Sequence, residues 1–300
     1  MNFKELLILL QLHRCSYHYL LEIFRYIVNN QLSEQYFDGD LLREVIHRVN
    51  LSLDNRRIQQ LPLNQINLSR LNEAKNLTNR AIMIGESIYP SNWLQLPQPP
   101  LIIYFEGDLT LLKKQSISII GTRNVSHYGI DVIKKLVALM CEEDWVLISG
   151  LAKGVDTTVH LEACRLKRKA TIGILANGFN YSYPLQNASL QAQMGHEQLL
   201  LSEYLPNQKA QRHQFIMRNR LVAGISPVTI VIEAAKDSGS LITANYALQY
   251  NREVFVLPGR ITDDQAYGCN ALLKVGANPI LSIESCVAEI KDLLRQMNNS

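Results

Sequence analysis

The chain has few of the features that mark secreted, membrane-spanning or strongly charged proteins. Its 300 residues include five scattered cysteines, an odd number without a C-x-x-C pair, which favours reduced thiols in the cytoplasm. No apolar run approaches the roughly 18 residues of a membrane span, and the run Leu6–Leu10 has no basic leader before it. The net charge of +3 permits a nucleic-acid partner without indicating one. We therefore expect a cytoplasmic chain without membrane insertion.

The signatures of several common catalytic and nucleotide-binding sites are also missing. No G-x-x-x-x-G-K-[ST] occurs, since Lys153 precedes its glycine, and no G-x-G-x-x-G follows a predicted strand. There is no G-x-S-x-G, and the histidines and cysteines lack zinc-ligand spacing. A P-loop ATPase and an ordinary NAD-binding protein are therefore disfavoured. We expect no metal, no cofactor and no catalytic residue.

What is present is a regular alternation of apolar runs and helical patterns. Residues 1–75 predict a small N-terminal helical domain, and 76–300 predict an extended Rossmann-like domain. Apolar strands between amphipathic helices imply an α/β, doubly wound, mostly parallel sheet. The predicted strands are Leu101–Phe105, Ile117–Ile120, Val146–Ile148, Thr171–Leu175, Leu199–Ser202, Val228–Ile232, Glu253–Leu257 and Pro279–Leu281. Helices between them are expected to begin near Gly129, Asp156, Ala188, Phe215, Ser240 and Gly268.

The N-terminal part shows apolar residues at helical spacing. One predicted stripe ends at Val28, and a second runs from Leu42 to Leu53 after Asp38, a candidate cap. Pro62 and the polar residues after it predict a linker or short helices.

Two glycine-containing loops follow the strands that end at Ile120 and Ile148. Backbone amides of such loops and helix N-termini bind phosphate oxygens at the carboxyl edge of a parallel sheet. The candidate phosphate-binding residues here are Gly121, Thr122, Arg123, Ser149, Gly150, Lys153 and Gly154. For the glycines, the alternative is a tight turn alone; for Arg123, it is an ion pair with Glu233.

The segment RHQFIMRNRLVAG, residues 212–224, is the second distinctive element. Arg218, Asn219 and Arg220 are predicted to open a helix, where two cations oppose the helix dipole. We expect these two arginines either to bind an anion or to pair with carboxylates such as Glu203. In the helix predicted after the second glycine loop, His160 is interpreted as a packing or polar-network residue.

Together these segments resemble the DNA-processing protein A family. The matches run in order from about residue 80 to 282: YPSNWLQLPQPPLIIYFEGD, GTRNVSHYG, SGLAKGVDTTVH, the NG-x-x-x-x-YP pattern, LSEY, MRNRLVAG, VIEAAKDSGSLITA and PG…GCNALLKVGA. The resemblance implies a non-catalytic protein that binds single-stranded DNA, protects it during natural transformation and loads the RecA recombinase. It also implies a homodimer. A C-terminal winged helix, common in the family, is not expected here.

The resemblance also assigns site residues. Besides the two loops above, it implies a DNA-binding role for Tyr183, Asn187, Arg218, Asn219, Arg220, Ser238, Gly239 and Ser240. Leu185 stands where the family commonly has a lysine, which puts one phosphate contact in doubt. Asn180 and Ile216 replace the usual aspartate and proline. Aromatic platforms for bases, expected at single-strand sites, are sought in Phe179, Tyr181 and Tyr183, with core packing as the alternative.

The segment GCNALLKVGA supplies the candidate dimer interface. Leu272, Leu273 and Val275 lie near the end of the predicted sheet, with burial inside the monomer as the alternative. Two other readings of the whole chain stay open. One is a nucleoside-monophosphate phosphoribohydrolase-like enzyme, whose P-G-G-x-G-T-x-x-E signature is absent, and the other is a protein-interaction scaffold.

Overall fold

The computed structural model describes residues 1–53, 70–166 and 169–298. It divides into two compact units. The first contains Met1–Glu86 and Pro100–Tyr104, and the second contains Ser87–Pro99 and Phe105–Ser300. The domain boundary predicted at residue 75 stays a prediction, and the linker predicted around Pro62 lies outside the described residues.

The first unit is mainly helical. Asn2 and Glu5 form a capping box at the start of α1, whose apolar residues are buried almost all round. The stripe from Leu42 to Leu53 is buried as predicted, and the Asp38 carboxylate accepts from the first amides of α3. The prediction for Val28 is wrong: it lies in the last turn of α2 and is exposed. The elements are α1 (Phe3–Leu12), α2 (Tyr17–Asn29), α3 (Gly39–Leu53), α4 (Leu71–Thr78), β1 (Ala81–Met83) and, antiparallel to it, β2 (Ile102–Gly107).

The second unit alternates strands with helices, as predicted. Its strands are β3 (Ser116–Ile120), β4 (Val146–Ser149), β5 (Thr171–Leu175), β6 (Leu199–Ser202), β7 (Val228–Val231), β8 (Glu253–Val256) and β9 (Asn278–Pro279). Its helices are α5 (His127–Glu142), α6 (Val155–Arg165), α7 (Ala188–Glu197), α8 (Arg212–Ile225), α9 (Gly239–Gln249), α10 (Tyr267–Lys274) and α11 (Ile283–Asn298). Short 3-10 turns include η3 (Ser91–Gln95) and η5 (Leu185–Asn187).

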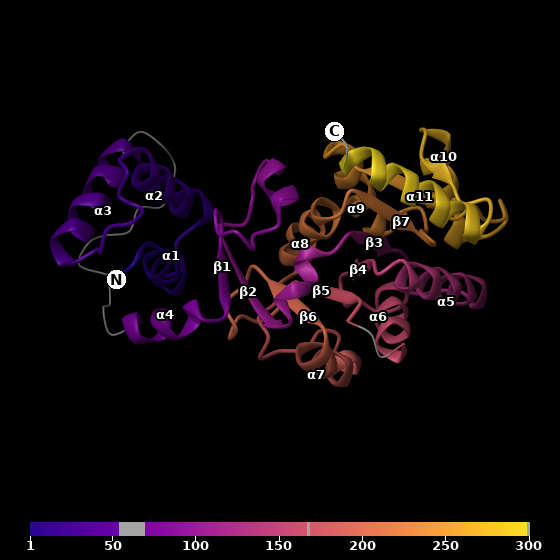
Figure 1. Cartoon of the computed structure of the whole chain (residues 1–300), viewed down its shortest axis with the longest axis horizontal. Helices are drawn as coiled ribbons and strands as arrows, with labels where there is room; N and C mark the ends of the chain where they lie inside the picture. The colour runs from indigo at the N-terminus through magenta and orange to yellow at the C-terminus, as the bar shows by residue number, and fades with distance from the viewer. Residues whose placement is uncertain (54–69, 167–168, 299–300) are drawn as a thin grey trace. The chain divides into compact units, whose positions relative to one another are not determined.

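The strand order in this unit is β6-β5-β4-β3-β7-β8-β9, and each of these pairs is parallel. Figure 1 shows β6, β5, β4, β3 and β7 following one another across the unit. The chain winds outward from β3 to β6, then returns to the other side of β3 with β7. The switch point therefore lies between β3 and β7, where doubly wound proteins bind their ligands. The predicted fold class is confirmed.

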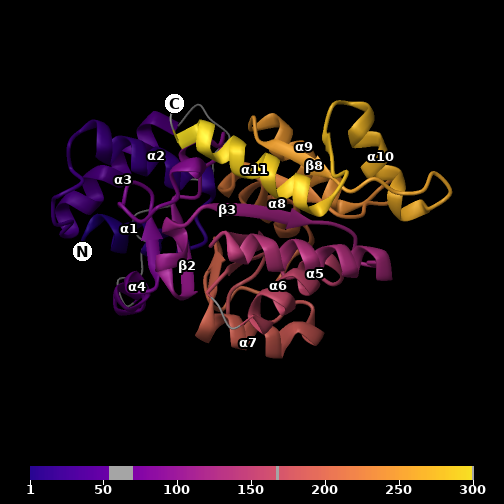
Figure 2. The ribbon, with the colours of Figure 1, turned by 45° about the vertical axis from the view of Figure 1, so that its right-hand side comes forward.

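Both faces of the sheet are covered, and β3 shows how. Ile117 and Ile119 join the apolar core formed with α5, α6 and α11. Ser118 points to the opposite face, where its hydroxyl donates to the Val222 carbonyl of α8 at 2.6 Å. Figure 2 shows α5, α6 and α7 in succession on one side of β3, with α9 and α10 on the other side in that view.

Candidate functional site

A pocket of about 810 Å³ opens at the carboxyl ends of β3 and β7, at the switch point of the sheet. Its walls come from the loops after β3, β4, β7 and β8 and from one face of α8. The pocket brings together most of the residues predicted from sequence: Gly121, Thr122, Arg123, Gly150, Arg218, Asn219, Ser238, Gly239 and Ser240. Their role in binding stays a prediction, but they do share one concave surface.

Close backbone packing holds the loop after β3. The Thr122 amide donates to the Glu233 carbonyl at 2.7 Å, and the Thr122 carbonyl accepts from Val155 at 3.1 Å. Gly154 has a φ of +79°, and a Cβ there would lie 2.3 Å from the Thr122 oxygen. Only glycine fits this approach. Gly154 does not line the pocket, so its visible role is to fix the backbone that carries Arg123.

Arg123 is exposed at the edge of the pocket. The predicted alternative, an ion pair with Glu233, does not form, and no other carboxylate pairs with Arg123 in the described part of the chain. The Glu233 carboxylate instead accepts from the Ser126 amide at 2.9 Å and from the Ser126 hydroxyl. The Arg123 guanidinium is therefore available to an anion.

Arg218 forms the floor of the pocket and is 7% exposed. Its Nη1 donates to the Ile174 carbonyl at 2.5 Å, and its Nε donates to Asn219 Oδ1 at 3.2 Å. Asp156 lies beside it, 8% exposed, with Oδ2 accepting from the Ala152 amide at 3.2 Å. Burial raises the pKa of Asp156, against the opposing effect of Arg218. Burial likewise lowers the pKa of Arg218, against the effect of Asp156.

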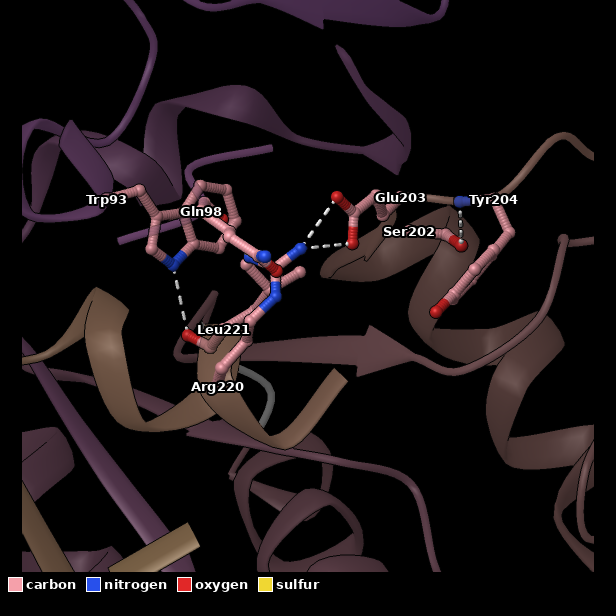
Figure 3. Close-up of polar contacts among 7 residues, drawn as sticks. All are labelled: Trp93, Gln98, Ser202, Glu203, Tyr204, Arg220 and Leu221. Carbon is pink, nitrogen blue, oxygen red and sulfur yellow. Dashed lines mark hydrogen bonds and ion pairs between the residues drawn. The ribbon is translucent and has the colours of Figure 1, made fainter. Parts of the chain in front are cut away.

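Arg220 lies outside the pocket lining. Its Nη2 donates to both oxygens of Glu203, at 2.7 and 2.6 Å, and its Nη1 donates to the Gln98 carbonyl at 2.6 Å (Figure 3). The Trp93 indole donates to the Leu221 carbonyl at 3.0 Å in the same cluster. The sequence left two alternatives for these arginines, a bound anion or a carboxylate partner. Arg220 has the carboxylate partner, Glu203.

The prediction that Arg218 and Arg220 open a helix is wrong. Helix α8 begins at Arg212, where the Gln211 amide donates to the Gln214 side chain at 2.6 Å. Polar residues fill this first turn, so it lacks the apolar spacing that marks a helix in sequence. The two arginines are therefore well inside α8, and the expected conflict with the helix dipole is absent.

The loop after β7 ends at the N-terminus of α9, which borders the pocket. Ser238 caps this helix, with its Oγ accepting from the Ser240 amide at 3.3 Å and lying 2.6 Å from the Ser240 Oγ. Lys236 adds an exposed cation, with its ammonium 5.9 Å from the centroid of the Tyr267 ring. The helix N-terminus and the lysine both favour an anion in this part of the pocket.

Several predicted site residues do not reach the pocket. The buried Ser149 hydroxyl donates to the Ile119 carbonyl at 2.7 Å, so it is not presented as a donor to a ligand. The Asn187 amide is buried and donates to the Leu151 carbonyl and to Thr157 Oγ1, at 2.9 and 2.8 Å. Lys153 is exposed but outside the lining. His160 is buried and bonds Thr171 at 2.7 Å, as interpreted, and burial lowers the pKa of His160 to about 3.

The three aromatic residues after β5 differ in exposure. Phe179 is 9% exposed and Tyr181 lies under the Lys209 ammonium, whereas Tyr183 is 48% exposed. The Tyr183 ring packs on Phe215 with centroids 4.8 Å apart, and Phe215 lines the pocket. Leu185, at the position where the family commonly has lysine, is 80% exposed. Tyr183 and Phe215 therefore form an aromatic pair beside the pocket, and the role of Tyr183 as a platform for a base stays a prediction.

Several other pocket residues were not singled out from the sequence, among them Arg212, Phe215, Lys236, Asp237, Asp264, Gln265 and Tyr267. They lie on the first half of α8, on the loops after β7 and β8, and at the start of α10. Those loops were recognisable as carboxyl-edge loops. Nothing in their spacing shows which of their side chains face inward.

Of the predicted interface residues, Leu272 is 5% exposed and buried in its own chain. Leu273 is partly exposed, and Val275 is 71% exposed. Leu272 therefore belongs to the monomer core, and its predicted place at a dimer interface is wrong. For Leu273 and Val275, the dimer interface stays a prediction. In the described residues, no helix combines the length and apolar character needed to span a membrane.

These features define a doubly wound α/β protein with a charged pocket at its switch point. A family model described as DNA recombination-mediator protein A matches residues 80–291, and the chain belongs to this family. It is 41% identical to DNA processing protein DprA of Bacillus subtilis over 213 residues, covering 70% of this chain and 71% of the relative. It is 36% identical to DprA of Streptococcus pneumoniae, covering 69% of this chain and 73% of the relative.

Solved structures agree with this assignment. The X-ray structure of DNA processing protein A from Streptococcus pneumoniae matches 96% of this chain and 99% of its own, with a TM-score of 0.81 and 30% identity. A structure of the Helicobacter pylori protein, described for its single-stranded DNA binding mode, matches 71% of this chain and 96% of its own, with a TM-score of 0.65 and 29% identity. The chain is a DNA-processing protein of this family.

Proposed function

We propose that the chain holds the backbone of single-stranded DNA in the pocket at the switch point and passes the strand to the RecA recombinase during natural transformation. The site acts in the cytoplasm by binding alone, without catalysis. The observation that carries this proposal is Arg123, an exposed guanidinium at the pocket edge without a carboxylate partner among the described residues.

The pocket suits a phosphate backbone next to unstacked bases. Arg123, Arg212 and Lys236 supply exposed cations, and the N-terminus of α9 supplies backbone amides. Tyr183 and Phe215 lie beside them, and base–aromatic stacking contributes about 1–3 kcal/mol per base. Contacts of this kind bind without reading sequence, because phosphates position a strand but do not identify its bases.

We expect the chain to bind single-stranded DNA more tightly than duplex of the same length, with little dependence on base sequence. The logarithm of the affinity should fall linearly with the logarithm of salt, with a slope near −0.7 for each phosphate neutralised. Fluorescence anisotropy with labelled oligonucleotides measures both. Equal affinity for duplex and single strand would contradict the proposal, and release of free base from a nucleotide would instead support an enzyme. Faster RecA filament nucleation on strands carrying the protein would support the loading step.

We also propose a homodimer that pairs through the exposed part of the segment containing Leu273 and Val275. A two-fold interface buries the same patch twice, so one added charge acts twice. Val275→Arg should therefore give a folded monomer, because the side chain is 71% exposed in the chain by itself. Light scattering measures the mass, and circular dichroism checks the fold. A monomeric unmodified protein at micromolar concentration, or a dimeric variant, would overturn the proposal.

A further inference from the structure

The pocket carries charges of both signs. Arg123, Arg212, Arg218 and Lys236 line it, but so do the carboxylates of Asp156, Asp237 and Asp264. A site that only attracts anions gains nothing from carboxylates in its lining. Specific sites often contain a repulsive group that disfavours the wrong ligand. The acidic residues therefore point to a limit on the charge that the pocket accepts.

Asp156 differs from the other two acids in its surroundings. Asp237 and Asp264 are exposed, as are Arg123, Arg212 and Lys236, so solvent and salt screen them. Asp156 is 8% exposed at the floor of the pocket, beside the buried Arg218. Charges interact more strongly where water is excluded. Asp156 is thus the carboxylate that a phosphate entering the pocket experiences most.

The structure fixes Asp156 firmly in this place. A Cβ on Gly150 would lie 2.4 Å from Asp156 Oδ2 and 2.5 Å from Arg218 Nη1, so the glycine makes room for both groups. The Ala152 amide holds Oδ2, and the Ile174 carbonyl holds Arg218. Burial raises the pKa of Asp156, and the Arg218 guanidinium and this amide oppose that shift. Because the buried guanidinium carries a charge, we take the carboxylate beside it as its counterion. At the floor, one negative charge therefore offsets the one positive charge.

We propose that Asp156 is a specificity-determining residue that makes the pocket accept a singly charged phosphodiester and disfavour a doubly charged phosphate monoester. The exposed cations attract either ligand but are screened by solvent and salt. The Asp156 carboxylate repels a second negative charge on a phosphate at the floor, where water is excluded. An internal strand phosphate carries one negative charge, whereas a terminal phosphate or a free mononucleotide carries between 1.5 and 2 at about pH 7. The pocket would thus remain open to DNA in a cell rich in nucleotides. This inference rests on the proposed binding of single strands.

A matched pair of small ligands tests the proposal. Thymidine 5′-monophosphate and its methyl phosphate ester, in which one phosphate oxygen carries a methyl group, share base, sugar and phosphate. The ester is a diester with a single negative charge. Each competes with a labelled single strand of thymidines for the full chain at pH 8. With the unmodified protein, the ester should compete at least about tenfold better than the monoester. Asp156→Asn, which removes the floor carboxylate, should reduce this ratio to about threefold or less by improving competition by the monoester. Asp131→Asn on the exposed side of α5 should leave the ratio unchanged.

The outcomes separate this inference from the proposed function. If the unmodified chain binds no labelled strand, the proposed function fails and this inference fails with it. If the strand binds but both ligands compete alike, or neither competes, only the charge discrimination is overturned. Removing a buried partner of Arg218 lowers stability, so melting temperatures accompany the variants. The comparison of the two ligands on the unmodified protein decides the matter even where Asp156→Asn does not fold.

Discussion

Glu203→Ala is expected to lower the free energy of unfolding by about 3–5 kcal/mol, because it leaves the buried Arg220 guanidinium without its carboxylate. Arg220 and Glu203 have side-chain exposures of 5% and 15%, and both Glu203 oxygens accept from the same guanidinium nitrogen (Figure 3). Burial raises the pKa of Glu203, and Arg220 opposes this shift. Urea unfolding followed by circular dichroism measures the change.

Asp292→Ala is the matched control for this variant. Asp292 pairs with Arg295 on α11, where both side chains are about two-thirds exposed, at 69% and 66%. Such a surface pair contributes about 0.2–1 kcal/mol at most. Replacing Glu203 and Arg220 together by leucine and methionine should recover much of the loss, because no uncompensated charge remains. A loss below about 1 kcal/mol for Glu203→Ala would show that solvent reaches the pair and compensates it.

Arg123→Ala is expected to weaken single-strand binding by about tenfold or more, to a similar degree for all base sequences. A charge-assisted hydrogen bond contributes about 1.5–3 kcal/mol, and a contact to phosphate carries no base information. The magnitude of the salt slope should fall by about 0.7, the contribution of one phosphate contact on a single strand. The melting temperature should stay unchanged, because the exposed guanidinium holds no ion pair within the described residues. Anisotropy titrations at several salt concentrations measure affinity and slope together.

Arg165→Ala provides the comparison. Arg165 lies at the end of α6 remote from the pocket, is 67% exposed and pairs with Glu162. Its removal changes the net charge by the same amount without touching the site. Equal losses for the two variants would assign the effect to overall charge, and an unchanged affinity for Arg123→Ala would remove Arg123 from the binding site.

The strands of the second unit could be predicted closely from the sequence. Ile117–Ile120 and Val146–Ile148 are apolar except for Ser118 and are followed by a glycine or a serine. The observed strands differ from them only by a residue at an end. Strands that are covered on both faces appear in the sequence as nearly continuous apolar runs. Their positions can therefore be predicted from neighbouring residues alone. The carboxyl-edge loops follow directly, and with them Gly121, Arg123 and Gly150.

Where each helix begins, and which of its residues are buried, was harder to predict from the sequence. The first turn of α8 is polar and amphipathic spacing begins only later, so Arg212 and Phe215 were not recognised as pocket residues. Leu272 and Val275 illustrate the same limit, since both are apolar and close in sequence, yet one is buried and the other exposed. Burial depends on which neighbouring element covers a residue, and that is a property of the assembled chain.

The sequence by itself determined the α/β class, the strand positions and the loops that form the pocket, because each depends on residues next to one another in the chain. Only the tertiary structure decided what the charged residues do. Arg218 and Arg220 are two residues apart, yet one forms the pocket floor beside Asp156 and the other pairs with Glu203. On a helix, positions two apart point in different directions. Asp156 lies in the first turn of α6, after β4, and Glu203 directly follows β6. The strand order brings both of them to α8.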